Sequence, residues 1–165
     1  MRIIVRQAKL SEATAIARLH SAVADSLTRD FGPGHWSSKV SEKGVLFAMR
    51  MSTVYVVSDR TEVIATFQFG TKKPWAIDKS YFVQRARPLY LMAMAVEPSL
   101  QRRGIGRAML EQAKRIAHEW PGDSIRLDAY DSPAGAGGFY SKCGFTEVGR
   151  VVYRGTPLIY YELIL

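Results

Sequence analysis

The sequence predicts a single mixed α/β domain of 165 residues. Strand-like and helix-like segments alternate through the middle of the chain, and the last residues read as an antiparallel hairpin. A basic, glycine-bearing turn, Gln101–Arg107, joins an apolar strand to an amphipathic helix. A chain of this length has room for one sizeable core and little room for a second. We therefore expect residues 1–165 to form one domain.

The first half of the chain is expected to contain three strands and two helices. Ser11 is a suitable N-cap for the first helix. That helix carries apolar residues at steps of three and four, namely Ile16, Leu19, Val23 and Leu27. The expected order is a strand over Ile3–Gln7, this helix, a loop over 28–38, a helix around 40–50, and strands over 53–58 and 62–70. Residues 71–87 show no clear period.

The second half begins with a run, Leu89–Val96, that is apolar at almost every position and therefore reads as a strand buried on both faces. A helix follows Gly104 and is closed by Pro121 and Gly122. The remaining expected elements are a strand over 125–130, a short helix started by Ser132-Pro133 and running through Lys142 with Gly144 at C′, and strands over 146–153 and 158–165. Residues 134–138 are poor helix formers and read either as a distorted start of this helix or as a loop near the cofactor.

The composition narrows the classes of function. The formal net charge is +8, which favours nucleic acid, an anionic membrane surface or a polyanionic small molecule as partner. The basic residues form no block and no nucleic-acid signature is present, so these features disfavour nucleic acid as the partner. Cys143 is the only cysteine, which excludes an intrachain disulfide. With no signal peptide and no run near the roughly 18 apolar residues of a membrane span, we expect a cytoplasmic protein without membrane attachment.

The Gln101–Arg107 turn predicts an anion-binding site. The free N–H groups at a helix N-terminus and the positive end of the helix dipole both favour phosphate. A Walker-type loop would need a Gly-Lys-Ser/Thr ending, which this chain lacks. A dinucleotide fingerprint would need a glycine before Gly104 and Gly106. The turn therefore indicates a phosphorylated cofactor, and the missing residues weaken ATP and NAD as candidates.

Three segments together resemble the GNAT superfamily of acyl-CoA-dependent N-acetyltransferases. Gln101-Arg102-Arg103-Gly104-Ile105-Gly106 is similar to the family's Gln/Arg-x-x-Gly-x-Gly/Ala motif, and Met94–Pro98 to the strand end before it. Phe139–Phe145 resembles the family's aromatic-Tyr-x-x-x-Gly-Phe segment. The order of elements agrees across nearly the whole chain. The resemblance implies one twisted, mixed, largely antiparallel sheet of six to seven strands with helices on both faces.

The resemblance also implies a cofactor site for acetyl-CoA, and the dispersed histidines His20, His35 and His118 predict no metal site. The amide of Val96 would polarise the thioester carbonyl, and the pantetheine arm would lie along the strand end. The implied cofactor-binding residues are Met94, Ala95, Val96, Gln101, Arg102, Arg103, Gly104, Ile105, Gly106 and Arg107. The arginines among them would account for part of the net charge.

The reaction implied is transfer of an acetyl group to a primary amine by direct attack. Tyr140 is the candidate general acid for the leaving sulfur, with core packing as the alternative reading. Asp128 is the candidate base, although a carboxylate at a strand end can also serve solvation or capping. Glu97 is a weaker candidate, and Tyr90 stands where lysine-specific relatives carry a glutamate. Pro133 replaces an asparagine that many relatives carry seven residues before the tyrosine.

The acceptor site is the least defined part of the prediction. His35 and Trp36 lie in a loop that shapes the acceptor pocket in related proteins, and Trp36 could equally anchor that loop. The amine itself, small or peptidic, stays open, and so does a homodimer. A non-catalytic acyl-CoA sensor is the alternative function.

Overall fold

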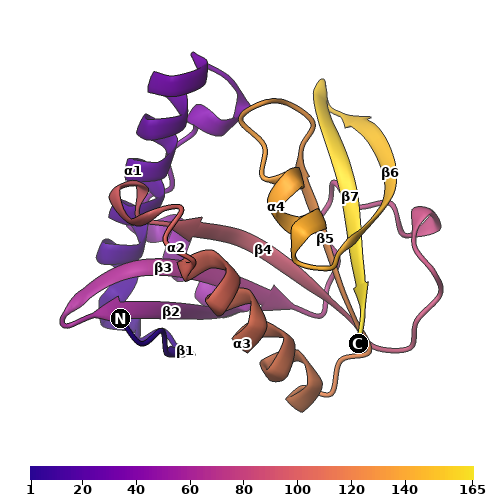
Figure 1. Ribbon diagram of the computed structural model, residues 1–165, viewed down its shortest axis with the longest axis horizontal. Coiled ribbons are helices and arrows are strands. Elements are labelled where there is room, and N and C mark those ends of the chain that lie inside the picture. The colour runs from indigo at the N-terminus through magenta and orange to yellow at the C-terminus, as the bar shows by residue number, and fades with distance from the viewer. The chain divides into compact units, whose positions relative to one another are not determined.

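The computed structural model describes residues 1–165 and divides into two compact units. The first comprises residues 1–69 and 92–113, and the second comprises residues 70–91 and 114–165. Strand β4 (Pro88–Val96) and helix α3 (Ile105–Glu119) each run through both units. The hydrogen-bonded strand order is β1-β2-β3-β4-β5-β7-β6, a mixed sheet of seven strands (Figure 1). The predicted fold class is confirmed.

The first unit is built on an antiparallel β1-β2-β3 meander. Its strands are β1 (Val5–Gln7), β2 (Thr53–Asp59) and β3 (Glu62–Gly70), with Val5 opposite Val57 and Tyr55 opposite Phe67. Its helices are α1 (Ala13–Phe31) and α2 (Glu42–Met51). One strand face buries Val54 and Val56 against these helices. The other face stacks Tyr55 on Phe67 with ring centroids 5.0 Å apart.

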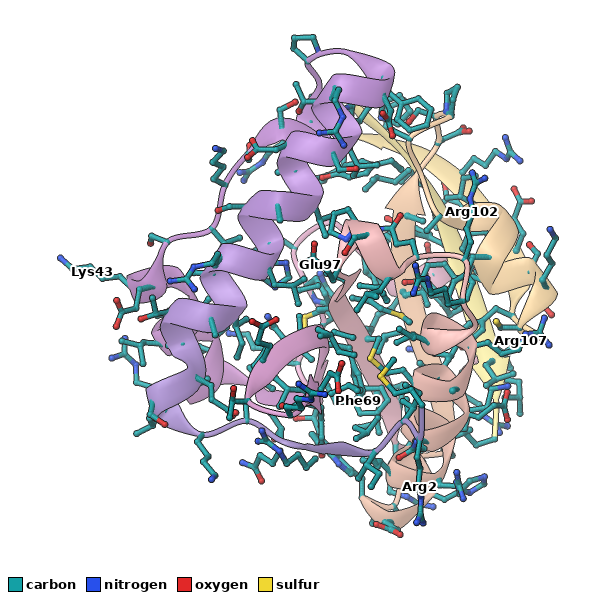
Figure 2. The ribbon with its side chains drawn as sticks, turned by 60° about the vertical axis from the view of Figure 1, so that its left-hand side comes forward. Arg2, Lys43, Phe69, Glu97, Arg102 and Arg107 are labelled. Carbon is teal, nitrogen blue, oxygen red and sulfur yellow. The ribbon has the colours of Figure 1, made fainter.

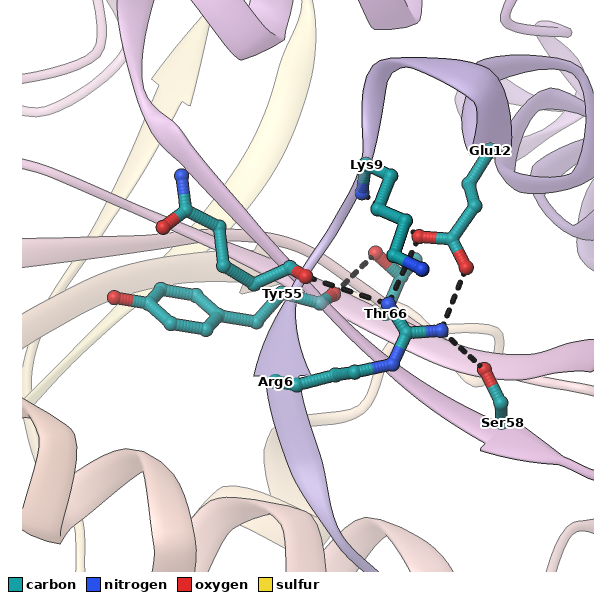
Figure 3. Close-up of polar contacts among 7 residues, drawn as sticks. Arg6, Lys9, Glu12, Tyr55, Ser58 and Thr66 are labelled. Carbon is teal, nitrogen blue, oxygen red and sulfur yellow. Dashed lines mark hydrogen bonds and ion pairs between the residues drawn. The ribbon is translucent and has the colours of Figure 1, made fainter.

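The start of α1 differs from the prediction. A short 3₁₀ turn, Leu10–Glu12, precedes the helix, so Ser11 lies inside that turn and Glu12 takes the N-cap position. Glu12 is held by Arg6, whose Nη2 lies 2.6 Å from Glu12 Oε1 and 2.9 Å from Ser58 Oγ (Figure 3). The Lys9 amide donates to the same carboxylate at 2.8 Å. An ion pair to β1 therefore fixes the helix entry where the sequence indicated a serine cap.

The second unit is built on β5 (Ser124–Tyr130), β6 (Thr146–Tyr153) and β7 (Thr156–Ile164). β7 pairs antiparallel with both of the others, and the first residues of β4 run parallel to β5, with Pro88 opposite Ser124. The β6–β7 turn is Arg154-Gly155, and both residues have positive φ. That is the conformation of a tight two-residue hairpin turn.

Helix α4 (Gly137–Lys142) is shorter than predicted. Residues 132–136 form a turn in which the Gly135 amide bonds Ser132 O at 2.9 Å, so Ser132 is not the N-cap of α4. A Cβ on Gly135 would come within 1.9 Å of Tyr130 O, which shows how closely the two backbones approach. Gly144 follows the helix with a φ of 93°, as its predicted C′ role requires.

Candidate active site

The end of β4 in the first unit carries the predicted cofactor strand. Ala95 is buried, Met94 and Val96 are partly buried, and Ala93 is exposed with a φ of 50°. A non-glycine residue in the left-handed region is uncommon and interrupts regular strand geometry. The backbone therefore changes direction one residue before Met94.

The turn after β4 is fastened at both ends. The Glu97 amide donates to Ile64 O of β3 at 2.8 Å, and Pro98–Leu100 form one 3₁₀ turn. The side-chain amide of Gln101 donates to Val96 O at 3.1 Å. Gln101 thus ties the turn back to the last strand residue, so its side chain acts on the position of Val96.

The first turn of α3 presents unpaired amides. The Ala108 amide bonds Gly104 O at 3.0 Å, which leaves the amides of residues 105–107 without a partner inside the helix. Gly104 has a φ of 81°, and a Cβ there would meet nothing within 4 Å. Glycine is therefore required by the backbone conformation, and the space beside the turn is open.

Only positive charge flanks this helix terminus. Arg102, Arg103 and Arg107 are exposed, and the first turn contains no acidic residue. Figure 2 shows Arg102 and Arg107 at the N-terminal end of α3. Free amides, the helix dipole and three guanidinium groups all favour a bound anion such as a pyrophosphate. The geometry fits the phosphorylated cofactor that the sequence predicted.

Tyr140 lies on α4 in the second unit and is only 8% exposed. Its ring contacts those of Phe139, Phe145 and Tyr161, with centroids 5.3, 5.7 and 6.0 Å away. Burial raises the pKa of the Tyr140 hydroxyl, and the nearby negative charge of Asp128 raises it further. The hydroxyl therefore stays protonated at neutral pH and is a weaker acid than an exposed tyrosine hydroxyl.

Asp128 lies on β5, on the face opposite to Tyr140. Asp128 is paired with Tyr160 and Leu127 with Tyr161, and directly paired residues point to the same face. Tyr161 contacts Tyr140, whereas Tyr160 packs with Ile77 and Phe82. Burial raises the pKa of the Asp128 carboxyl, which makes it a better proton acceptor near neutral pH than an exposed aspartate.

A buried ion pair on the Asp128 face was missed by the sequence reading. Arg126 Nε donates to Glu162 Oε2 at 2.9 Å, and both side chains are 3% exposed. The same guanidinium donates to Tyr90 Oη at 3.2 Å and to Val83 O at 2.6 Å. Tyr90, at the position where lysine-specific relatives carry a glutamate, is thus engaged by Arg126. The sequence signal for this ion pair was Arg126 itself, a charged residue between the apolar residues of β5 that needs a partner if it is buried.

The predicted acceptor loop is held by its own residues. Trp36 Nε1 donates to Gly32 O at 2.9 Å, and a Cβ on Gly34 would come within 2.4 Å of the indole. Trp36 is partly buried and His35 is exposed. The indole therefore anchors the loop, and His35 is the more accessible of the two side chains.

The structure contains no group of three or more His, Cys, Asp or Glu side chains arranged to hold a metal ion. None of its helices is both long enough and apolar enough to cross a lipid bilayer.

Comparison with known families identifies the chain. Residues 50–147 match the family model described as the acetyltransferase (GNAT) domain. The chain belongs to this family. The matched range contains β4, the Gln101–Arg107 turn, Asp128 and Tyr140. The resemblance seen in the sequence is confirmed at the level of the family.

Solved GNAT structures share the fold at low sequence identity. The chain is similar to the PaiA N-acetyltransferase from Thermoplasma acidophilum in complex with coenzyme A, with 14% identity, full coverage of both chains and a TM-score of 0.75. It is similar to a Salmonella typhimurium protein solved with its cofactor acetyl-CoA, with 17% identity, coverage of 99% and 94%, and a TM-score of 0.71. The chain is also similar to the ribosomal-protein-S18-alanine N-acetyltransferase from Escherichia coli, with 16% identity, coverage of 99% and 94%, and a TM-score of 0.70. No curated protein matches the sequence.

Proposed function

We propose that this GNAT protein transfers an acetyl group from acetyl-CoA to a primary amine by direct attack, with both units acting as one N-acetyltransferase domain. The observation that carries the proposal is the Gln101–Arg107 turn. This turn combines a glycine in the left-handed conformation, the free amides at the start of α3 and three exposed arginines. It lies within the part of the chain that matches the acetyltransferase family. Two structural neighbours solved with acetyl-CoA or coenzyme A support the choice of donor.

The turn would hold the pyrophosphate of the donor. The amides of residues 102–107 would donate to its oxygens, and Arg102, Arg103 and Arg107 would balance its charge. The main chain of Met94–Val96 would pair with the pantetheine arm, and the Val96 amide would donate to the thioester carbonyl oxygen as negative charge develops there. Gln101 would keep Val96 in place through its bond to the Val96 carbonyl. The donor supplies the activated acetyl group.

The second unit would move the protons. The amine must be neutral to attack, because an ammonium group has no free electron pair. Asp128, with its raised pKa, would accept the proton that the amine loses as its nitrogen bonds the carbonyl carbon. The Tyr140 hydroxyl would protonate the sulfur as the carbon–sulfur bond breaks, and would recover a proton from solvent.

Two measurements in sequence test this function. Calorimetric titration with acetyl-CoA should show binding, and thiol release should then appear with at least one member of a broad amine panel. Absence of binding would refute the donor assignment. Binding without thiol release from any amine would favour the non-catalytic sensor.

A further inference from the structure

The second unit contains a groove of about 690 Å³ that the proposed chemistry does not use. One wall is the segment between β3 and β4, with Lys73, Trp75 and Tyr81, and the other is the end of β6, with Val152 and Tyr153. Tyr160 also lines it. Because Tyr160 and Asp128 are paired and point to the same face, the groove opens on the Asp128 face of β5 and β7.

The wall formed by the segment between β3 and β4 is held to β7 by hydrogen bonds and a ring contact. The Asp78 amide donates to Tyr160 Oη at 3.1 Å, and the same hydroxyl donates to Ala76 O. The Tyr81 ring meets Tyr160 edge-on at 5.4 Å. It also lies so close to β6 that a Cβ on Gly149 would come within 2.2 Å of it. The aromatic wall therefore has a fixed place that depends on glycine at position 149.

Large apolar side chains in the groove face solvent. Trp75 is 83% exposed and Tyr81 is 42% exposed, and both line the groove. Isolated exposed apolar residues are ordinary, but a cluster beside a concave surface marks an interaction site. Tryptophan in particular contributes strongly to binding when a partner buries it.

The β6 side of the groove offers unpaired main-chain groups. β6 is the last strand of the sheet, so one of its edges has no neighbour. In a two-residue hairpin the flanking pair Tyr153–Thr156 is hydrogen-bonded, which makes Val152–Pro157 a non-hydrogen-bonded pair. Proline, which has no N–H, fits that position. The N–H and C=O of Val152 therefore point to the free edge, where an extended chain can add.

The charge around the groove selects an acidic partner. Lys73 and Lys79 line it, and Arg154 lies over the Tyr153 ring at 5.2 Å. The one lining carboxylate, Asp78, already accepts from the amide and the hydroxyl of Ser80 at 2.9 and 2.7 Å. Three cationic side chains thus surround one carboxylate that already accepts two hydrogen bonds, and this excess of positive charge favours an anionic ligand.

We propose that this groove binds an extended acidic peptide segment, which adds to the free edge of β6 and packs against Trp75. In the acetyl-transfer reaction this segment belongs to a protein or peptide acceptor, a role that rests on the proposed function. Bases of a nucleic acid could stack on Trp75, so the choice of a peptide rests on the free edge of β6, whose main-chain groups pair with a peptide main chain.

Fluorescence anisotropy tests the groove without any acetyl transfer. The probe is a fluorescein-labelled peptide of alternating glutamate and valine, compared with the same peptide carrying lysine in place of glutamate and with labelled oligoadenylate. The acidic peptide should bind most tightly. Trp75→Ala should weaken its binding about tenfold, and Lys73→Glu with Lys79→Glu should do so by about as much. Lys43→Glu, a matched change on the exposed face of α2, should leave binding unchanged.

The outcomes separate the groove from the donor site. Equal binding of the lysine peptide, tighter binding of oligoadenylate, or equal loss in Lys43→Glu would each overturn the groove proposal. Acetyl-CoA titrated into the same proteins reports the donor site independently. A peptide that binds to a protein unable to bind acetyl-CoA would refute the acetyltransferase function and leave the groove standing.

Discussion

Asp128 and Tyr140 lie on opposite faces of the sheet in the second unit. Asp128 shares its face with Tyr160, and Tyr140 contacts Tyr161 on the other. Burial raises the pKa of both groups. The proposed base and the proposed acid are therefore separated by one strand layer. The two roles can be tested separately, Asp128 by the pH dependence of kcat and Tyr140 by turnover at unchanged acetyl-CoA affinity.

Asp128→Asn should lower kcat by about a hundredfold, because it removes the proton acceptor. In the wild-type protein, kcat should rise with pH through the Asp128 pKa, which lies above the ordinary aspartate value of 3.8. The variant should lose this acidic limb. A pH–rate profile in both proteins, with the preferred amine of the panel, makes the measurement. An unchanged limb in Asp128→Asn would exclude Asp128 as the base.

The same substitution should change stability in a direction fixed by linkage. A carboxyl whose pKa is raised on folding contributes stability at pH values below its unfolded pKa, and this is lost as the pH rises through the folded pKa. Asp128→Asn should therefore be more stable than wild type at neutral pH, and the difference should shrink below pH 3.8. Urea unfolding at several pH values tests this. A variant less stable than wild type at neutral pH would contradict it.

Tyr140→Phe should lower kcat by about tenfold or more while acetyl-CoA affinity changes little, because only the proton donor is lost. Phe145→Leu is the matched control, since it removes a ring that packs on Tyr140 and leaves the hydroxyl in place. The control should lose stability but keep most of its turnover. Equal turnover in Tyr140→Phe and wild type would remove Tyr140 from the mechanism.

Arg126→Met should destabilise the protein by about 3–5 kcal/mol, because it leaves the Glu162 carboxylate buried without its partner. Arg126→Met with Glu162→Leu should recover much of this loss, since no uncompensated charge remains. The free energy of unfolding in urea for the single and double variants gives the coupling. A double variant no more stable than the single one would show that the ion pair is not the source of the effect.

Local patterns predicted most of the fold. The continuous apolar run of β4 and the alternation in β5 each carry their own period, so these strands were found within one residue. The three- and four-residue steps identified α1, but this helix continues to Phe31, four residues beyond its predicted end. Gly104 and Gly144 were recognised because their left-handed backbones favour glycine.

The errors lie where tertiary contacts override local preference. Ser11 has the chemistry of a cap, but the Arg6–Glu12 ion pair places the helix start elsewhere. Ser132-Pro133 reads as a helix start, but the close approach of Gly135 to Tyr130 keeps residues 132–136 in a turn. The Arg126–Glu162 pair joins residues on β5 and β7, and no local pattern reports which strands become neighbours.

The most direct test of the account is acetyl-CoA binding by Gly104→Asp. Gly104 and Gly155 both have left-handed backbones, with φ of 81° and 82°, and a Cβ on either would meet nothing within 4 Å. Aspartate therefore strains both turns alike, but only at Gly104 does it place a carboxylate in the proposed pyrophosphate site. Calorimetry should show acetyl-CoA binding to wild type and to Gly155→Asp, and none to Gly104→Asp. Equal binding to all three proteins, or binding to none, would contradict the central claim that the Gln101–Arg107 turn holds the acetyl donor.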